Sequence, residues 1–183
     1  RDLSAAQRAG VDAGMTTYLL DSNVFIEAKN RYYGLDFCPA FWDWVAQQND
    51  AGRVFSIEKV GDELAAGQDQ LAAWASGFGA KLFLPPTSAM LPSLSAVSQW
   101  VSDQSFLPSA VTDFLQGADY YLVACAHANG HVVVTHEVHS NAVKRVKIPT
   151  VCVGMGVKFM NTFEMLRNEQ ARFVLQLGPN HLA

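Results

Sequence analysis

The chain has 183 residues, half of them hydrophobic, and a formal net charge of −4. A chain of this length suits one domain with its own core, and its hydrophobic content excludes an intrinsically disordered protein. No run reaches the roughly 18 apolar residues of a membrane helix, and the first residues lack a secretory signal pattern. We therefore expect no membrane partner, and three widely spaced cysteines in apolar stretches favour a reducing, cytoplasmic location.

The first well-patterned segment begins at Met15, after a polar stretch rich in Ala and Gly. We expect residues 1–14 to be an N-terminal extension or an expression remnant, residues 15–170 to form one domain, and residues 171–183 to be a C-terminal tail. The three cysteines are far apart and show no CxxC spacing, so neither a disulfide framework nor a zinc knuckle is expected.

Hydrophobic periodicity and turn residues divide the domain into short strands and helices. In chain order, the patterns predict a strand at 17–20, a helix from 24, a helix at 39–51, a strand at 53–56, helices around 60–64 and 71–74, an extended segment at 81–84, helices around 94–101 and 111–115, a helix at 118–128, a strand at 131–135, a strand within 148–153 and a helix at 162–168. Ser56 is a candidate cap for the helix around 60–64. Short apolar strands separated by helices are typical of an α/β protein with a parallel sheet covered on both faces.

Four acidic residues stand near the ends of predicted elements or on a helix. Asp21 directly follows the first strand, and Glu137 follows the strand at 131–135. Asp119 lies in the first turn of the Ala-rich helix predicted at 118–128. Glu63 lies on a helix, four positions after Lys59. Functional side chains gather beyond the carboxyl ends of parallel strands, which favours a shared site. Each residue also has a structural explanation, as a helix cap, a first-turn charge, a surface partner of Lys59 or a loop residue.

The segments LLDSNVFIEA, VGDELAAG and ADYYLVACAHANGHVVVTHE occur in an order that resembles the PIN-domain superfamily. The shared pattern is an Asp closing the first strand, a Glu in mid-chain, an Asp opening an Ala-rich helix, and an acidic residue after the next strand. This resemblance spans roughly residues 17–168. The segments FWDW, VTHE and KIPTVC are most similar to a bacterial group of PIN-like proteins that resembles VapC-type toxins. The resemblance implies a PIN-like three-layer α/β/α fold around a central, mainly parallel sheet of four to five strands.

The same resemblance implies a metal-dependent ribonuclease and a set of site residues. It assigns a catalytic acidic cluster that binds Mg²⁺ or Mn²⁺, and one polar residue that contacts substrate: Asp21, Glu63, Asp119 and Glu137, with Asn23. Glu137 departs from the common pattern, which has Asp at that position. Asn161 is a candidate for a late polar ligand.

Elementary electrostatics also favours a cation at such a cluster. Four carboxylates separated by about 6 Å would repel one another by more than the typical stability of a domain, about 5–15 kcal/mol. The cluster must therefore bind protons or recruit a cation, and all-oxygen ligands select Mg²⁺ or Mn²⁺ over zinc. A bound ion lowers the pKa of its water and orients the substrate phosphate, so that hydrolysis needs no nucleophilic side chain.

Basic residues are concentrated late in the chain. Lys144, Arg145 and Lys147 fall within four positions, and Lys158 and Arg167 follow. We predict that Lys144, Arg145 and Lys147 bind substrate phosphates, with a solvated surface run as the alternative. The net negative charge argues only weakly against a nucleic-acid partner, because bound cations reverse the local sign.

Three further motifs receive structural interpretations. His136 and His139 are three positions apart beside a strand, whereas the zinc motif HExxH needs histidines four apart on one helix face. The Gly-Met-Gly segment at 154–156 lacks the third glycine and the acidic partner of a dinucleotide fingerprint. The aromatic segment at 41–44 is predicted to be core or a dimer interface rather than a surface for base stacking.

We therefore expect an endoribonuclease that hydrolyses RNA phosphodiesters and acts as the toxin of a toxin–antitoxin pair. RNA, a cognate antitoxin and a second copy of the chain are the expected partners. The toxin role follows from the resemblance alone. Two alternatives stay open: a catalytically weak PIN scaffold that binds RNA or protein, and a metal-dependent phosphatase or DNA nuclease on the same fold.

Overall fold

The computed structural model describes residues 15–175, whose five strands form one all-parallel sheet. The strands are β1 Tyr18–Leu20, β2 Val54–Ile57, β3 Phe83–Leu84, β4 Val132–Val134 and β5 Phe159–Met160, and their spatial order is β3-β2-β1-β4-β5. The chain runs outward from β1 to β2 and β3, then crosses to β4 on the other side of β1. This reversal creates a topological switch point between β1 and β4, and α/β proteins commonly bind ligands beyond the carboxyl ends of strands at such a point.

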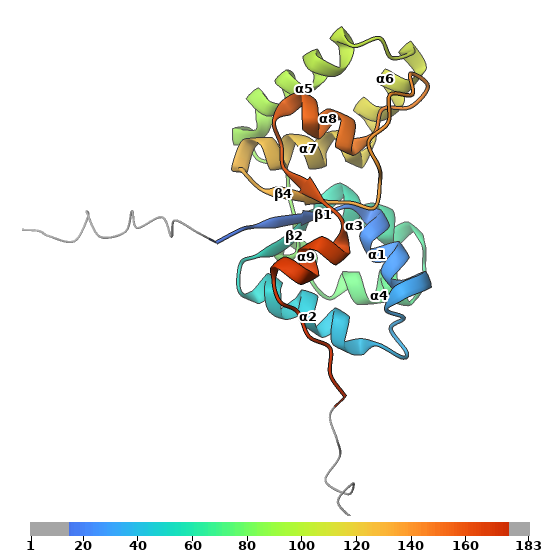
Figure 1. Ribbon diagram of the computed structural model, residues 1–183, viewed down its shortest axis with the longest axis vertical. Helices are drawn as coiled ribbons and strands as arrows, with labels where there is room; N and C mark the ends of the chain where they lie inside the picture. Colours follow the sequence, from blue (N-terminus) through green and yellow to red (C-terminus); the bar gives the residue numbers. More distant parts are fainter. Residues whose placement is uncertain (1–14, 176–183) are drawn as a thin grey trace, which may run out of the picture.

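Helices cover both faces of this sheet (Figure 1). Their bounds are α1 Ser22–Glu27, continued by a π-helical turn Ala28–Tyr32, α2 Pro39–Asp50, α3 Glu58–Ala66, α4 Gln70–Ser76, α5 Leu91–Asp103, α6 Pro108–Gln116, α7 Ala118–Asn129, α8 Ile148–Met155 and α9 Thr162–Asn168, with short 3-10 turns at Gly79–Lys81 and Ser88–Met90. Helices α5, α6, α7 and α8 lie on one side of the sheet, and α1, α2, α4 and α9 lie on the other. The expected three-layer α/β/α fold with a parallel sheet is confirmed.

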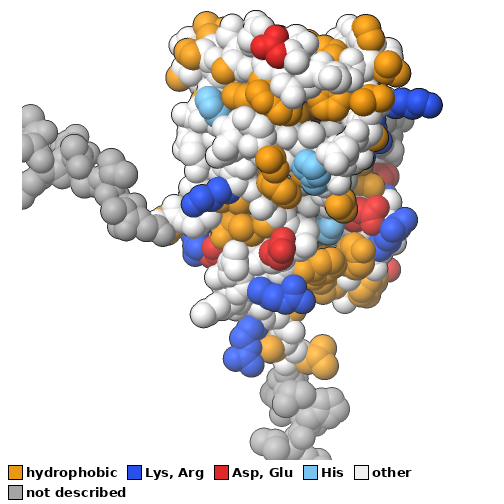
Figure 2. Space-filling model, turned by 45° about the horizontal axis from the view of Figure 1, so that its top comes forward, with side chains coloured by type: hydrophobic (Ala, Val, Ile, Leu, Met, Phe, Trp, Pro, Cys, Tyr) orange, Lys and Arg blue, Asp and Glu red, His pale blue; other side chains and the backbone are white. Residues whose placement is uncertain are grey.

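The central strands are buried on both faces. Every residue of β1 and of β4 is buried, which explains why these strands are continuous apolar runs rather than alternating ones. In the aromatic segment at 41–44, Phe41 and Trp42 lie in the core, as predicted. Hydrophobic side chains also remain on the surface, where they are mixed with Lys, Arg and His side chains (Figure 2).

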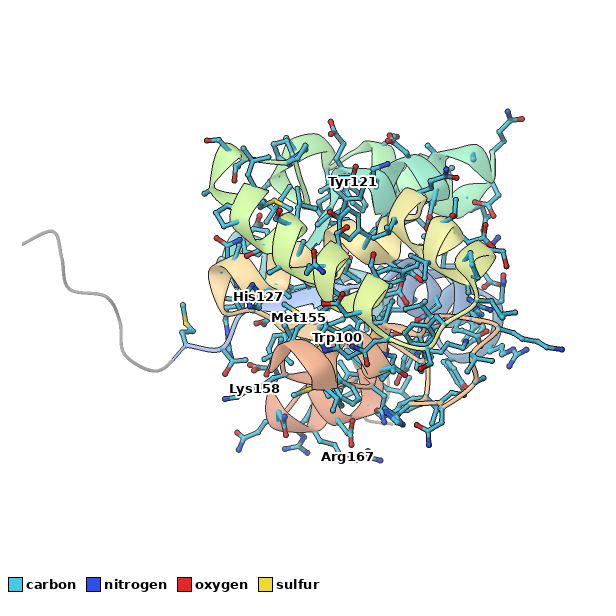
Figure 3. All side chains as sticks on the ribbon, turned by 90° about the horizontal axis from the view of Figure 1, so that it is seen from above. Trp100, Tyr121, His127, Met155, Lys158 and Arg167 are labelled. Atoms are coloured by element: carbon cyan, nitrogen blue, oxygen red, sulfur yellow. The ribbon has the colours of Figure 1, made fainter. Side chains whose placement is uncertain are left out.

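The strand predicted within 148–153 is wrong, because that segment forms helix α8, and the edge strand β5 follows it instead. Pro149 lies in the first turn of α8, where its missing N–H group is not needed. Gly156 ends the helix with a φ of 67°, so the Gly-Met-Gly segment is a helix end and not a phosphate-binding loop. A Cβ at Gly154 would come within 2.0 Å of Trp100 from α5, which is labelled in Figure 3, so Gly154 lets these two helices approach closely.

The structure also excludes the predicted helix cap at Ser56 and the ion pair that was the alternative explanation of Glu63. Ser56 does not cap the following helix: it is buried in β2, and its hydroxyl donates to the carbonyl of Leu20 at 2.6 Å. Lys59 is not paired with Glu63. Its ammonium lies 4.4 Å from the centre of the Tyr121 ring, a cation–π contact between α3 and α7.

The predicted N-terminal extension at 1–14 and the end of the predicted tail at 176–183 lie outside the described residues. Within the described part of that tail, the Phe173 ring contacts the rings of Tyr33 and Phe41 at centroid distances of 5.8 and 6.2 Å. Across residues 15–175, no helix combines the length and the apolar character that crossing a membrane requires.

Candidate active site

Asp21 lies at the switch point, immediately after β1. Its backbone N–H donates to the carbonyl of Val134 at 3.0 Å, which extends the β1–β4 ladder by one step. Asp21 is 3 % exposed, and its side chain makes no capping hydrogen bond to α1. Helix capping therefore does not explain why an aspartate stands at this position. Burial, and then the charge of Asp119, raises the pKa of Asp21 to about 7. A buried carboxyl group with this pKa changes its charge near neutral pH.

The hydroxyl of Thr135 connects Asp21 to the loop that follows β4. Thr135 Oγ1 donates to Asp21 Oδ2 at 2.9 Å, and it accepts from Asn23 Nδ2 and from the N–H of Glu137, both at 3.1 Å. Asn23 in turn accepts from the N–H of His136 at 3.0 Å through its Oδ1. Asn23, which was predicted to contact substrate, is therefore engaged at both ends of its amide and orients this loop.

Asp119 lies in the first turn of α7 and is partly buried. Burial, followed by the charges of Glu137 and Glu63, raises the pKa of Asp119 to about 6, while the charges of Arg145 and Lys147 oppose that rise. Among the described residues, no side chain or N–H group donates a hydrogen bond to the Asp119 carboxylate. Its charge is therefore poorly compensated.

Glu63 lies on α3 with its side chain exposed. Its charge contributes to the raised pKa of Asp119, so the predicted association between these two acidic residues is electrostatic. In the described part of the chain, Glu63 makes no ion pair and no side-chain hydrogen bond. It faces solvent at the edge of the site.

Glu137 differs from the other three acidic residues because its carboxylate is paired with two basic side chains. Oε1 accepts from Lys147 Nζ at 2.7 Å and from Arg145 Nη2 at 3.1 Å, and Oε2 accepts from the N–H of Ile148 at 2.9 Å. Only 9 % of its side chain is exposed. The carboxylate thus fastens the loop after β4 to the beginning of α8, where a negative charge is favourable. Glu137 would have to release these partners to bind a metal ion.

The predicted phosphate-binding residues lie close to the carboxylates. A cleft of about 250 Å³ is lined by Asp119, Lys144 and Arg145 together with Asp113 and three apolar residues. Lys144 is exposed, and the Arg145 side chain is 67 % exposed although one nitrogen contacts Glu137. Lys147 is more buried and is paired with Glu137. A phosphate in this cleft would meet Lys144 and the free part of the Arg145 guanidinium.

Three other residues of the sequence analysis lie elsewhere. The side chain of Asn161 caps α9 in a capping box with Glu164, accepting from its N–H at 2.9 Å, so its oxygen is already engaged. Lys158 lines two larger cavities, of about 520 and 720 Å³, at the opposite, amino ends of the strands. Arg167 lies exposed in the last turn of α9, and Figure 3 shows it at the opposite side of the view from Tyr121 of α7.

The side chains at this edge of the sheet fit a divalent cation only in part. Within residues 15–175, no three His, Cys, Asp or Glu side chains are grouped so that they could hold a metal ion. In the part of the chain that the structure describes, neither the buried Asp21 nor the partly buried Asp119 forms an ion pair with a basic side chain. Mg²⁺ typically binds through one or two carboxylates and keeps several water molecules for substrate phosphates to replace. Asp21 and Asp119 fit such a water-rich site, whereas Glu137 with its present partners does not.

The comparison with protein families identifies the chain at the level of a family. A family described as a domain of unknown function, DUF4411, matches residues 18–173. The chain belongs to the DUF4411 family. The match includes the whole site, from Asp21 to Glu137, and its description names no activity. No curated protein matches the chain.

Thr135 belongs to the site, although the sequence did not predict it as a site residue. It was predicted only as the last residue of a strand, yet it holds Asp21, Asn23 and Glu137 together. The available signal was its position: a polar residue that directly follows three valines at the carboxyl end of a buried strand. In a parallel sheet such a residue lies beside the residue that follows the neighbouring strand.

Proposed function

We propose that this protein is a metal-dependent endoribonuclease that hydrolyses RNA phosphodiesters at the carboxyl edge of its sheet. The observation that supports it best is the pair Asp21 and Asp119, two poorly solvated carboxylates whose pKa values are raised to about 7 and about 6. A protein seldom keeps such a pair at a topological switch point without a cation or a proton to compensate it. Perturbed carboxyl groups in this setting are typical of active sites.

Mg²⁺ or Mn²⁺ is the proposed cofactor, held by Asp21 and Asp119. When bound, the ion would act as a Lewis acid on a phosphoryl oxygen and lower the pKa of a water molecule. The residues of the chain then have separate roles. Thr135 fixes the orientation of the Asp21 carboxylate, and Asn23 holds the loop that carries Thr135 and Glu137.

Substrate phosphates are proposed to bind in the cleft beside Asp119. Lys144 and the exposed nitrogens of Arg145 provide positive charge there, opposite the carboxylates. Glu137 is assigned to anchoring this basic segment, because it pairs with Arg145 and Lys147 and accepts from the first N–H of α8. The net charge of −4 is no obstacle to an RNA substrate when bound cations reverse the sign of the site.

RNA as the substrate, and the role of toxin in a toxin–antitoxin pair, are supported by the resemblance of the three acidic segments to PIN domains. In that role a cognate antitoxin would cover the carboxylates, and a basic side chain from it could compensate them as a metal ion does. We also propose that the protein forms a homodimer, in which each copy has its own site.

The second candidate is a PIN-like scaffold that binds RNA or protein with little catalysis. One observation favours it: Glu137 is tied up by Lys147, Arg145 and Ile148, which leaves fewer carboxylates for a second metal ion. The scaffold would bind RNA without cleaving it.

Cleavage of RNA in the presence of Mn²⁺ tests the proposal. We expect the purified chain to cleave a fluorescently labelled single-stranded RNA, and Asp21→Asn and Asp119→Asn to cleave it at least a hundredfold more slowly. Asp43→Asn is the matched control, because Asp43 is an exposed carboxylate on α2. Equal cleavage by all four proteins would indicate a contaminating nuclease and refute the proposal. Binding without cleavage by the wild-type protein would favour the scaffold.

A further inference from the structure

An aromatic cluster lies on the same edge of the sheet as the carboxylates. It consists of Tyr32, His136 and Phe163, which come from the π-helical turn after α1, the loop after β4, and α9. The ring centroids are 5.9 Å apart for Tyr32 and His136, 5.1 Å for Tyr32 and Phe163, and 5.8 Å for His136 and Phe163. None of the three pairs is stacked: the rings meet edge-on or tilted.

The cluster is not part of the hydrophobic core. The Tyr32 side chain is 41 % exposed, and His136 and Phe163 are half-buried, whereas Phe41 nearby is fully buried. Because the three rings meet edge-on or tilted at the surface, part of each ring can still contact another planar group, such as a base. An aromatic surface that a domain neither buries nor needs for its core is a candidate for binding.

The backbone around Tyr32 has an unusual conformation that determines where the ring lies. The N–H of Tyr33 donates to the carbonyl of Ala28, five residues earlier, at 2.6 Å, so the end of this helix is a π turn. Such a turn changes the angle between successive side chains from that of an α-helix, and it directs Tyr32 towards His136 and Phe163. Single π turns occur frequently at functional sites.

Hydrogen bonds connect the cluster directly to the carboxylate site. The N–H of His136 donates to Asn23, and Asn23 donates to Thr135, which holds Asp21. The His136 ring is fixed on its other side by Thr162, with a distance of 3.0 Å between Nε2 and the hydroxyl. The cluster is therefore held in a fixed position relative to the buried Asp21 carboxylate.

Charged side chains of both signs lie near the cluster. Arg31, beside Tyr32, is 68 % exposed and also pairs with Glu27 at 3.2 Å. Proteins bind single-stranded nucleic acid with aromatic rings that stack on bases and with cations that contact phosphates. Here the rings belong to the cluster, and the exposed cations are Lys144 and Arg145 in the cleft beside Asp119.

We propose that Tyr32, His136 and Phe163 form a stacking surface for unpaired nucleobases next to the scissile phosphate. This inference rests on the proposed ribonuclease function and specifies its substrate as single-stranded RNA. A base on this surface would hold the strand so that the following phosphate reaches Asp21 and Asp119. Duplex RNA, whose bases stack on one another, would gain nothing from the surface.

Fluorescence anisotropy with three labelled ligands tests this inference. The ligands are a single-stranded RNA with phosphorothioate linkages that resist cleavage, an abasic strand of the same length, and the corresponding duplex, all in the presence of Mn²⁺. We expect the wild-type protein to bind the single strand at least tenfold more tightly than the abasic strand or the duplex. Loss of one stacking contact corresponds to roughly 5- to 100-fold in Kd.

Two variants and one matched control separate stacking from general effects. Tyr32→Ala should weaken binding of the single strand by this factor and leave abasic binding unchanged, while Tyr32→Phe should bind as the wild type does. Phe37→Ala, which removes an aromatic side chain that is 69 % exposed but outside the cluster, should have no effect. Unchanged Mn²⁺ binding by Tyr32→Ala would exclude a folding defect as the cause.

The possible failures of the inference and of the proposed function differ. If Tyr32→Ala binds the single strand like the wild type, or the wild type binds the abasic strand equally well, the stacking surface is refuted while the ribonuclease proposal stands. If the wild type binds none of the three ligands, the proposed function itself is refuted.

Discussion

The hydroxyl of Thr135 donates a 2.9 Å hydrogen bond to Oδ2 of Asp21, although the two residues are 114 positions apart in the chain. They meet because β1 and β4 are parallel neighbours, with Leu20 opposite Val134, so the residues that follow these strands are side by side. The bond lowers the pKa of Asp21, against the larger effect of burial. Thr135 is thus the residue that keeps a buried carboxylate oriented at the switch point.

Thr135→Val should therefore affect stability and cation binding together. It removes one donor to Asp21 and one acceptor for two N–H groups, so we expect a loss of about 2–4 kcal/mol in the free energy of unfolding at about pH 8. Urea denaturation measures this loss, and Mn²⁺ affinity should fall as well. Thr135→Ser keeps the hydroxyl and is the control. If the Val and Ser variants are equally stable, the hydroxyl has no such role.

Asp21→Asn should stabilise the metal-free protein increasingly as the pH rises. The pKa of Asp21 is about 7 in the folded protein against a model value of 3.8, so the folded state binds the proton more tightly. Stability from this group is then full at low pH and is lost as the pH rises from about 4 to about 7. Asn has no charge to desolvate. We expect the difference in unfolding free energy between the variant and the wild type to grow by about 2–4 kcal/mol over that range.

Urea denaturation in the presence of a chelator, at several pH values, measures this difference. Asp43→Asn serves as the control, since Asp43 is exposed and should give a difference that does not vary with pH. A constant difference between Asp21→Asn and the wild type from about pH 4 to about pH 8 would contradict a raised pKa.

Glu137→Gln should separate an anchoring role from metal binding. The substitution removes the charge that holds Lys147 and Arg145, so we expect a loss of about 1–3 kcal/mol in stability. Mn²⁺ affinity should change by less than about tenfold, because the ligands of the proposed ion are Asp21 and Asp119. Calorimetry measures the affinity. A complete loss of Mn²⁺ binding in a folded Glu137→Gln protein would make Glu137 a ligand, as the resemblance to PIN domains implies.

Gly154→Ala should destabilise the packing of α8 on α5. The new Cβ would lie 2.0 Å from the Trp100 ring, so the indole or the helix must shift, at a cost of about 1–3 kcal/mol. Thermal or urea denaturation measures the change. Val153→Ala, at a neighbouring position that is 61 % exposed, should stay within about 0.5 kcal/mol of the wild type. Equal effects at both positions would show that the close approach of Trp100 does not limit the packing.

Most of the fold could be predicted from the sequence because its buried strands and amphipathic helices have distinct patterns. β1, β4 and α9 lie where the sequence patterns predict them, although Asn161 caps α9 instead of acting as the predicted late polar ligand. The segment at 148–153 was mistaken for a strand because a short apolar run of Ile, Val and Cys fits a buried strand and a buried helix equally well. Pro149 at its beginning and the left-handed Gly156 at its end are the features that decide for a helix.

The site was predictable only where its residues directly follow or begin an element. Asp21 and Asp119 could be assigned because a strand end and a helix start fix their positions within the fold. The partners of Glu137 could not, because they depend on the path of the loop from 135 to 147, which brings Lys147 back to within 2.7 Å of the carboxylate. The aromatic cluster was missed for a similar reason, since its three rings come from segments far apart in the sequence.

Binding of Mn²⁺ to the wild type, Asp21→Asn and Asp119→Asn, followed by isothermal titration calorimetry, tests the central claim most directly. We expect the wild type to bind Mn²⁺ with release of protons and with an affinity that falls as the pH drops below about 7, because the cation displaces protons from the two carboxyl groups. Both variants should lose this binding while remaining folded. Absence of binding to the wild type at millimolar Mn²⁺, or equal binding by all three proteins, would contradict a cation site at Asp21 and Asp119.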